Sequence, residues 1–172
     1  DLLKYCDYSA NPVGRMFLCL FGHKDRIRQA LSDSTCTGLQ LVNFWQDIRR
    51  DLDKGRIYIP KEDMSHFGYS EPDLFSGLEN DAFRNLIEFQ IDRTVAYLME
   101  GSQLVNILTG VSKLDVALFT SGGMQIANLI RRSNYKVLKS RPRLSSGGRH
   151  LLVFMNTLKY LFDMEQGYRL SK

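Results

Sequence analysis

Three polar residues recur every four positions near the middle of the chain: Asn43, Asp47 and Asp51. On a helix they form one row, with neighbouring Cβ atoms about 5–6 Å apart. Oxygen ligands of this kind suit a hard divalent cation, above all Mg²⁺, which commonly binds through one or two carboxylates together with substrate phosphates. The row therefore predicts a Mg²⁺–diphosphate site. The alternative is that Asp47 pairs with Arg50 and that Asp51 is only a surface charge.

Polar neighbours of this row support the first interpretation. Gln40 lies one turn earlier on a largely apolar segment, and a buried polar group there needs a partner, which a bound ion or ligand would supply. Arg56 and Tyr58 follow the end of the same predicted helix. They offer a cation and a phenol close to the row.

A second group of residues lies in the segment YCDYSANPVGR, where Tyr5 falls on the apolar face of a helical pattern. Tyr5 is either a core residue with a satisfied hydroxyl or a phenol that faces a pocket. In a pocket its ring or oxygen could stabilise a carbocation. Ala10 and Gly14 are small and four residues apart, which permits either close helix contact or room for a long substrate.

The elements that must position these residues are helical, because apolar residues recur at three- and four-residue spacing almost throughout. Pro12 predicts a break near Asn11. Ser32, Asp33 or Ser34 is expected to cap a helix that runs to about Lys54. Gly55 then ends that helix, and residues 56–60 are extended.

The second half of the chain is also predicted to be helical, after a loop at 61–77 that has room for one turn of helix. A long helix is expected from Asn80 or Asp81, another over 114–138 with a bend near Gly122 and Gly123, and a last one over 150–164 after a linker at 141–148. No alternating stretch is long enough for a sheet. The predicted fold class is therefore an all-α bundle.

Composition is that of an ordinary globular domain, with 44% hydrophobic and 24% charged residues in 172 positions. The longest apolar run is the six residues 16–21, whereas a transmembrane helix needs about 20. Three cysteines without a C-x-x-C pair argue against zinc or a disulfide framework. Reduced thiols in a cytoplasmic protein are the expected state.

Charge is unevenly distributed around a net value of +4. Residues 116–162 hold eight Lys and Arg and no acid, so the remainder carries a net charge of −4. Such a segment could meet phosphate, diphosphate, nucleic acid or an anionic membrane surface. The alternative is a solvated helix end followed by a loop.

The segments YCDYSANPVGR, CTGLQLVNFWQDIRRDLDKGRIYIPKED and SGGMQIANLIRRSNYKVLKSRPR resemble the squalene/phytoene synthase family of head-to-head prenyl transferases. The resemblance covers Leu2 to about Arg143. Within the family, the variants ANPVGR and NFWQD are most similar to the bacterial hydroxysqualene synthase branch of squalene and hopanoid biosynthesis. Gln46 stands where members with the variant NILRD have arginine, which puts one diphosphate contact in doubt.

The resemblance implies an all-α isoprenoid synthase fold around a large apolar cavity. In that fold two aspartate-rich helices hold Mg²⁺ and the substrate diphosphate. Asn43, Asp47 and Asp51 match the second of these motifs, whereas the first lies upstream of the YC segment. Residues 1–172 are therefore expected to be the C-terminal portion of a single synthase domain, incomplete at the N-terminus and inactive alone.

The resemblance also assigns roles to single residues. Asp47 and Asp51 are expected to be catalytic as metal ligands, and Tyr5 to be catalytic because it faces the reacting carbons. Gln40 would line the mouth of the cavity beside the row. Arg56 and Tyr58 would help to hold the diphosphate.

The activity implied is Mg²⁺-dependent conversion of presqualene diphosphate to hydroxysqualene, without NADPH or nucleic acid. One alternative is a presqualene diphosphate or phytoene synthase, which condenses two prenyl diphosphates. Another is a non-catalytic basic helical module that binds nucleic acid or an acidic partner through Arg131 to Arg143. A cytoplasmic enzyme with peripheral contact to an anionic membrane is compatible with the basic segment.

Overall fold

The structure is a computed structural model that describes the backbone of residues 1–170 and the side chains of residues 1–160. The described residues form helices and no strand, which confirms the predicted all-α class. The first five helices are α1 (Leu2–Ser9), α2 (Asn11–Leu20), α3 (Arg26–Leu52), α4 (Lys61–His66) and α5 (Glu71–Ser76). The others are α6 (Asp81–Ser102), α7 (Leu104–Ile107), α8 (Gly110–Arg132) and α9 (Ser146–Leu170).

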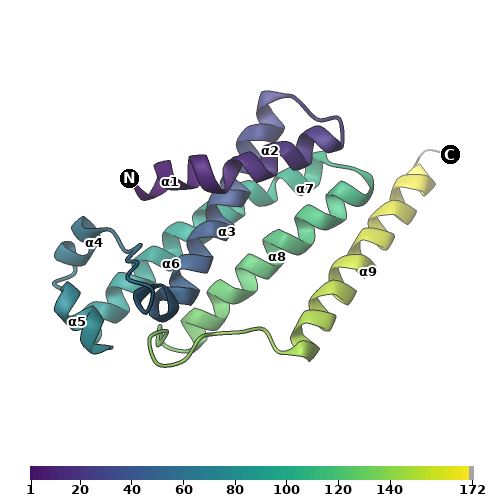
Figure 1. Cartoon of the computed structure of the whole chain (residues 1–172). Helices are drawn as coiled ribbons and strands as arrows, with labels where there is room; N and C mark the ends of the chain where they lie inside the picture. The colour runs from purple at the N-terminus through teal and green to yellow at the C-terminus, as the bar shows by residue number, and fades with distance from the viewer. Residues whose placement is uncertain (171–172) are drawn as a thin grey trace.

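The long helices α3, α6 and α8 form the centre of the bundle, and α3 packs most extensively on α6 (Figure 1). Their facing sides are apolar, as burial of a helix stripe requires. Trp45 of α3 is fully buried and its indole Nε1–H donates to Thr94 Oγ1 of α6 at 2.8 Å. Figure 1 also shows α1 and α2 crossing the top of this core and α9 beside α8. The contact of Trp45 with α6 holds α3 in one orientation about its own axis, which determines which of its residues face away from the core.

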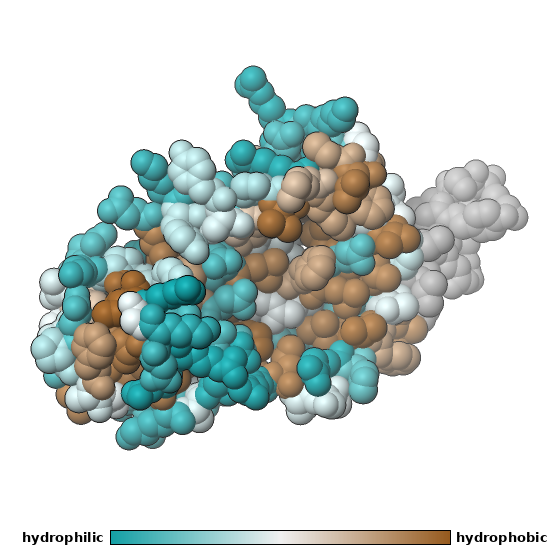
Figure 2. Space-filling view, in the orientation of Figure 1, coloured by the Kyte–Doolittle hydropathy of each residue, from teal (hydrophilic) through white to brown (hydrophobic). Residues whose placement is uncertain are grey.

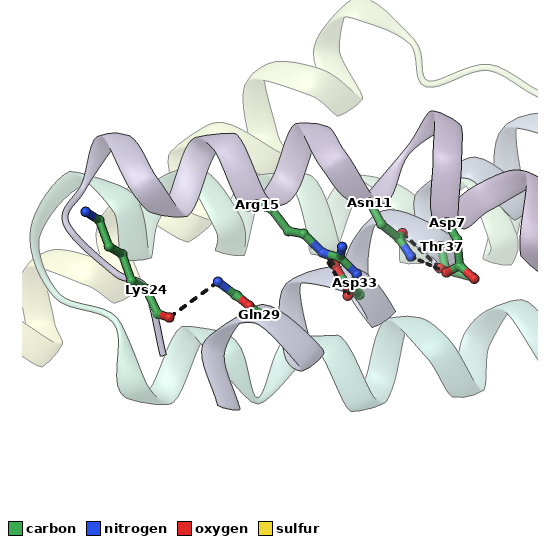
Figure 3. A network of polar contacts seen from close by, with 7 residues as sticks. All are labelled: Asp7, Asn11, Arg15, Lys24, Gln29, Asp33 and Thr37. Atoms are coloured by element: carbon green, nitrogen blue, oxygen red, sulfur yellow. Dashed lines mark hydrogen bonds and ion pairs between the residues drawn. The ribbon is translucent and has the colours of Figure 1, made fainter. Parts of the chain in front are cut away.

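The predicted break near Asn11 is confirmed, because α1 ends at Ser9 and α2 begins at Asn11 with Pro12 in its first turn. Figure 3 shows how the two helices are tied to α3. The buried Asn11 side chain donates to Asp7 at 2.8 Å and accepts from Thr37 Oγ1 at 3.1 Å. One turn along α2, Arg15 donates to Asp33 through Nε at 2.9 Å.

The central helix α3 begins earlier than predicted. Its N-cap is Asp25, whose carboxylate accepts from the Arg28 backbone N–H at 3.0 Å, and not a residue at 32–34. Ser32 lies buried inside the helix against Gly14 of α2. The predicted C-terminal end is confirmed, since Gly55 adopts φ +72° just after Leu52.

Residues 61–77 are more helical than the predicted loop with one helical turn. They form α4 and α5, and Ser70 caps α5 in a reciprocal capping box with Asp73. These short helices pack through Met64 and Leu74, which are buried. Their brevity explains the error, because six residues are too few to establish a helical period.

The helices of the second half are confirmed with shifted bounds. Asn80 caps α6 as predicted. Helix α8 covers 110–132 and not 114–138, because Asn134 and Tyr135 have positive φ angles that end it. It is continuous through Gly122 and Gly123, contrary to the predicted bend, and α9 begins at Ser146 and not near 150. No helix in the described part of the chain is long and apolar enough to cross a membrane.

Candidate functional site

The predicted polar row lies along one side of α3. At about 100° per residue, Gln40, Asn43, Asp47 and Asp51 fall within an arc of about 80°. Asn43 is exposed, and the other three are partly buried. The opposite side of the helix carries Trp45, which faces α6. The structure therefore brings the four residues together on one accessible strip.

Arg141, from the linker between α8 and α9, binds this strip. Its guanidinium contacts both carboxylate oxygens of Asp47, through Nε and through Nη2, the latter at 2.9 Å. The same Nη2 donates to Gln46 Oε1 at 3.0 Å, and Gln46 Nε2 donates to the Pro142 carbonyl. The expected partner Arg50 lies farther from Asp47, at 3.7 Å. Arg141 was missed as a site residue because the pair spans 94 residues of sequence.

The two carboxylates of the row have opposite electrostatic surroundings. The hydrogen bonds from Arg141 lower the pKa of Asp47, against the opposing effect of burial. Burial, followed by the charge of Asp47, raises the pKa of Asp51, although Lys54 and Arg56 partly offset it. Asp51 is the carboxylate that an added cation would stabilise most directly.

The turn after α3 brings a phenol back to the same region. Gly55 reverses the chain, and Arg56 N–H donates to the Asp51 carbonyl at 2.8 Å. The extended segment then returns along α3, so that Tyr58 stacks on Phe44 with 3.9 Å between ring centroids. Arg56 is exposed at the turn, close enough to affect the pKa of Asp51.

Tyr5 of α1 completes an aromatic cluster with these two rings. Its centroid lies 5.7 Å from Tyr58 and 5.9 Å from Phe44. Tyr5 is 46% exposed, so it is not a core tyrosine. Burial, and then the neighbouring Tyr5 hydroxyl, raise the pKa of Tyr58. Both phenols line an open groove of about 490 Å³ that also borders Leu2 and Lys61.

A second groove, almost wholly apolar, lies against the N-terminal half of α3, before the polar strip. It has a volume of about 280 Å³ and is bordered by side chains of α2, α3 and α8, including Val13, Phe17, Leu39 and Phe119. Figure 2 shows hydrophobic residues gathered over this part of the molecule. Gly14 serves close helix contact here, because a Cβ atom would lie 2.3 Å from Ser32 Oγ.

The donor set of the row suits a hard cation, but it is small. Asn43, Asp47 and Asp51 supply amide and carboxylate oxygens, the ligands that Mg²⁺ prefers. Within residues 1–160, no group of three or more His, Cys, Asp or Glu is placed to hold a metal ion.

The basic segment is partly neutralised within the fold. Arg131 Nη2 pairs with Asp92 of α6 at 2.6 Å, and Arg141 pairs with Asp47. Lys136, Lys139 and Arg143 are exposed. Two of its cations therefore meet acids from the sequence-distant helices α3 and α6.

Comparison with known proteins identifies related chains. A sequence model described as squalene/phytoene synthase matches residues 1–147. The 15-cis-phytoene synthases of Synechococcus elongatus and Synechocystis are each 31% identical, over 82% of this chain and over 50% and 45% of their own lengths. The chain thus spans about half the length of the curated relatives it matches.

Solved structures give the same picture. The crystal structure of squalene synthase HpnC from Alicyclobacillus acidocaldarius superposes with a TM-score of 0.77 and 42% identity, covering 78% of this chain and 51% of that one. YisP from Bacillus subtilis has a TM-score of 0.78 and 26% identity, over 88% of this chain and 61% of its own. A dehydrosqualene synthase, 24% identical, shares the fold with a TM-score of 0.83 over 95% of this chain and 57% of its own.

Proposed function

Because the chain belongs to the squalene/phytoene synthase family and has the all-α isoprenoid synthase fold, we propose that it carries part of the active site of an enzyme that acts on a prenyl diphosphate. One observation carries the proposal. The Tyr5–Phe44–Tyr58 cluster adjoins the strip Gln40–Asn43–Asp47–Asp51, because Phe44 lies on α3 three residues before Asp47 and packs against both phenols. An acidic strip that could hold a cation and its diphosphate therefore adjoins an aromatic surface.

The acidic strip would hold Mg²⁺ together with a diphosphate. Asn43, Asp47 and Asp51 are the proposed ligands, and Arg56 and Gln40 would contact the diphosphate or its waters. When bound, the metal would stabilise negative charge on the departing diphosphate. Burial, followed by the charge of Asp47 one turn earlier, raises the pKa of Asp51, and an added cation beside the two carboxylates would offset both effects.

The aromatic cluster would face the reacting carbons. Loss of diphosphate from a prenyl substrate breaks a carbon–oxygen bond and leaves a carbocation. The exposed ring of Tyr5 and its neighbour Tyr58 present π faces and hydroxyl dipoles that stabilise a nearby cation. The apolar groove against the N-terminal half of α3 would bury the hydrocarbon and exclude water from it.

The reaction we propose is conversion of presqualene diphosphate to hydroxysqualene. Diphosphate leaves first as the carbon–oxygen bond breaks, the resulting cation rearranges, and water then captures it and gives up a proton. The 42% identity to squalene synthase HpnC, against 31% to the phytoene synthases, favours this branch. The second candidate, condensation of two prenyl diphosphates, is supported by those phytoene synthase relatives. A nucleic-acid-binding module is disfavoured, because Arg131 and Arg141 already pair with acids.

Substrate feeding separates the two reactions. The protein as its gene encodes it should release diphosphate from presqualene diphosphate but not from farnesyl diphosphate alone. Asp47→Ala should reduce this release by at least 100-fold, because it removes a charge that no neighbour replaces (about 2.7 kcal/mol in barrier). Asp53→Ala is the matched control, since Asp53 is exposed and pairs only with Arg49 in the described residues. Release from farnesyl diphosphate alone would instead establish the condensing reaction.

We also propose peripheral contact with an anionic membrane, which would suit an insoluble product. Arg143 and Arg149 are exposed near the start of α9, and Leu151, Phe154 and Met155 of α9 are 55–61% exposed. Exposed cations and exposed apolar residues in one segment favour an anionic lipid surface. The protein should sediment with phosphatidylglycerol vesicles and not with phosphatidylcholine vesicles. Equal behaviour with both would refute the contact.

A further inference from the structure

The linker between α8 and α9 contacts the acidic strip through the side chain of Arg141. Both oxygens of Asp47 are engaged by this guanidinium. The side chains are 28% exposed for Arg141 and 25% for Asp47, so the pair is shielded from water on most sides. A bidentate guanidinium–carboxylate contact is among the stronger ion pairs in proteins.

A divalent cation at Asp47 would need an oxygen that Arg141 already holds. Two positive groups cannot share a carboxylate edge without repulsion, so each must weaken the other. Arg50 imposes a weaker conflict, because its guanidinium lies 3.7 Å from Asp47, whereas Arg141 hydrogen-bonds both oxygens. The competition is therefore specific to the linker arginine.

We infer that Arg141 is a built-in counter-ion of Asp47 that a divalent cation displaces, so that metal binding releases part of the α8–α9 linker. This inference rests on the proposed metal role of the acidic strip. The released part is confined to residues 139–145. The preceding Val137 and Leu138 are buried, and Leu138 N–H donates to Glu79 at 2.9 Å.

Gln46 is the second residue that holds the linker against α3, and we call the contacts of Arg141 and Gln46 the latch. Its side-chain amide accepts from Arg141 and donates to the carbonyl of Pro142, and the residue is only 6% exposed. An arginine at this position has no acceptor and would repel Arg141. The departure from the NILRD variant at Gln46 thus has a structural consequence, namely a linker that closes over Asp47.

The size of the effect follows from the exposure of the pair. A charge-assisted, partly buried contact of this type is worth about fivefold in an equilibrium constant. Linkage is reciprocal, so Arg141 lowers metal affinity by the factor by which metal lowers the occupancy of the pair. Removal of Arg141 should therefore tighten metal binding about fivefold, and not weaken it.

Mn²⁺ titration of the chain, followed by electron paramagnetic resonance at low ionic strength, tests this inference. Arg141→Gln should bind Mn²⁺ about fivefold more tightly than the unmodified chain. Arg143→Gln is the matched control, because it removes one positive charge from an exposed position in the same linker. The inference is overturned if the two variants bind Mn²⁺ equally.

Amide hydrogen exchange provides the second readout. Mn²⁺ should accelerate exchange at residues 139–145 in the unmodified chain, and Gln46→Ala should accelerate it without metal. Asp47→Asn separates the two levels of the proposal. If this variant binds Mn²⁺ as the unmodified chain does, the proposed metal site is wrong and the latch falls with it. If it loses Mn²⁺ but Arg141→Gln gains nothing, only the latch is wrong.

Discussion

The contact between α3 and α6 offers the sharpest test of how the site is positioned. Gly101, near the end of α6, is buried against Thr35 of α3. A Cβ atom at position 101 would lie 2.5 Å from the Thr35 backbone nitrogen and 2.7 Å from its Cα atom. Backbone atoms cannot move aside as the end of a side chain can. Gly101→Ala must therefore push α6 away from α3.

The magnitude follows from ordinary packing distances. Non-bonded carbon contacts are most favourable at about 3.5–4.0 Å, so the helices must separate locally by about 1 Å. Overpacking of this kind costs about 1–3 kcal/mol. Position 101 is one residue from the helix end, so the helical preference of alanine offsets little of that cost. We expect a loss of about 2 kcal/mol, or about 4–8 °C in Tm for a chain of this size.

Gly122→Ala is the matched control, because no described heavy atom lies within 4 Å of its Cβ position in the middle of α8. That change should stabilise the chain by about 0.5–1 kcal/mol. Urea unfolding followed by Trp45 fluorescence measures both, since Trp45 is the single tryptophan and is fully buried between these helices. The reasoning is refuted if Gly101→Ala is no less stable than Gly122→Ala.

The remaining predictions concern the two carboxylates of the strip. Asp47→Asn should lower stability at pH 7 by about 1 kcal/mol. The lowered pKa of Asp47 means that its contribution is present above the unfolded value near 3.9 and disappears as pH falls through the folded value. Asp51→Asn should raise stability at pH 7 by about 0.2–0.5 kcal/mol, by removing one of two repelling charges. Because the pKa of Asp51 is raised, this gain should vanish below pH 3.9. Thermal unfolding at pH 7 and pH 3 measures both, and effects of the same sign at pH 7 would contradict them.

The long helices α3, α6 and α8 were predictable from this sequence, because their apolar residues recur at helical spacing over many turns. The N-cap of α6 at Asn80 and the reversal at Gly55 were also predictable, since each depends on one residue type with a local role. The start of α3 was not. Residues 32–34 include good capping residues, yet Ser32 is buried against Gly14. Tertiary packing overrode a local preference there.

The site divides in the same way. The row from Gln40 to Asp51 was predictable because its spacing lies within one helix. Arg141 was not, because the residue that neutralises Asp47 is 94 positions away and depends on the path of a linker. The acid-free basic segment did indicate that an anion would be met. The sequence could not show that this anion is Asp47, because that depends on how the linker folds back on α3. The stack of Phe44 on Tyr58 was unpredictable for the same reason, since it depends on the chain reversal at Gly55.

The arrangement along α3 favours an amphiphilic ligand over a small anion. Leu39 borders the apolar groove, whereas Asp47 lies eight residues later in the polar strip. At 1.5 Å per residue the two positions are about 12 Å apart along the helix. A free phosphate would use only the strip and leave the apolar groove and the exposed ring of Tyr5 without a role. Under the proposed function, a molecule with a diphosphate head and a long hydrocarbon tail would use both regions, and the aromatic cluster adjoins the strip at Phe44.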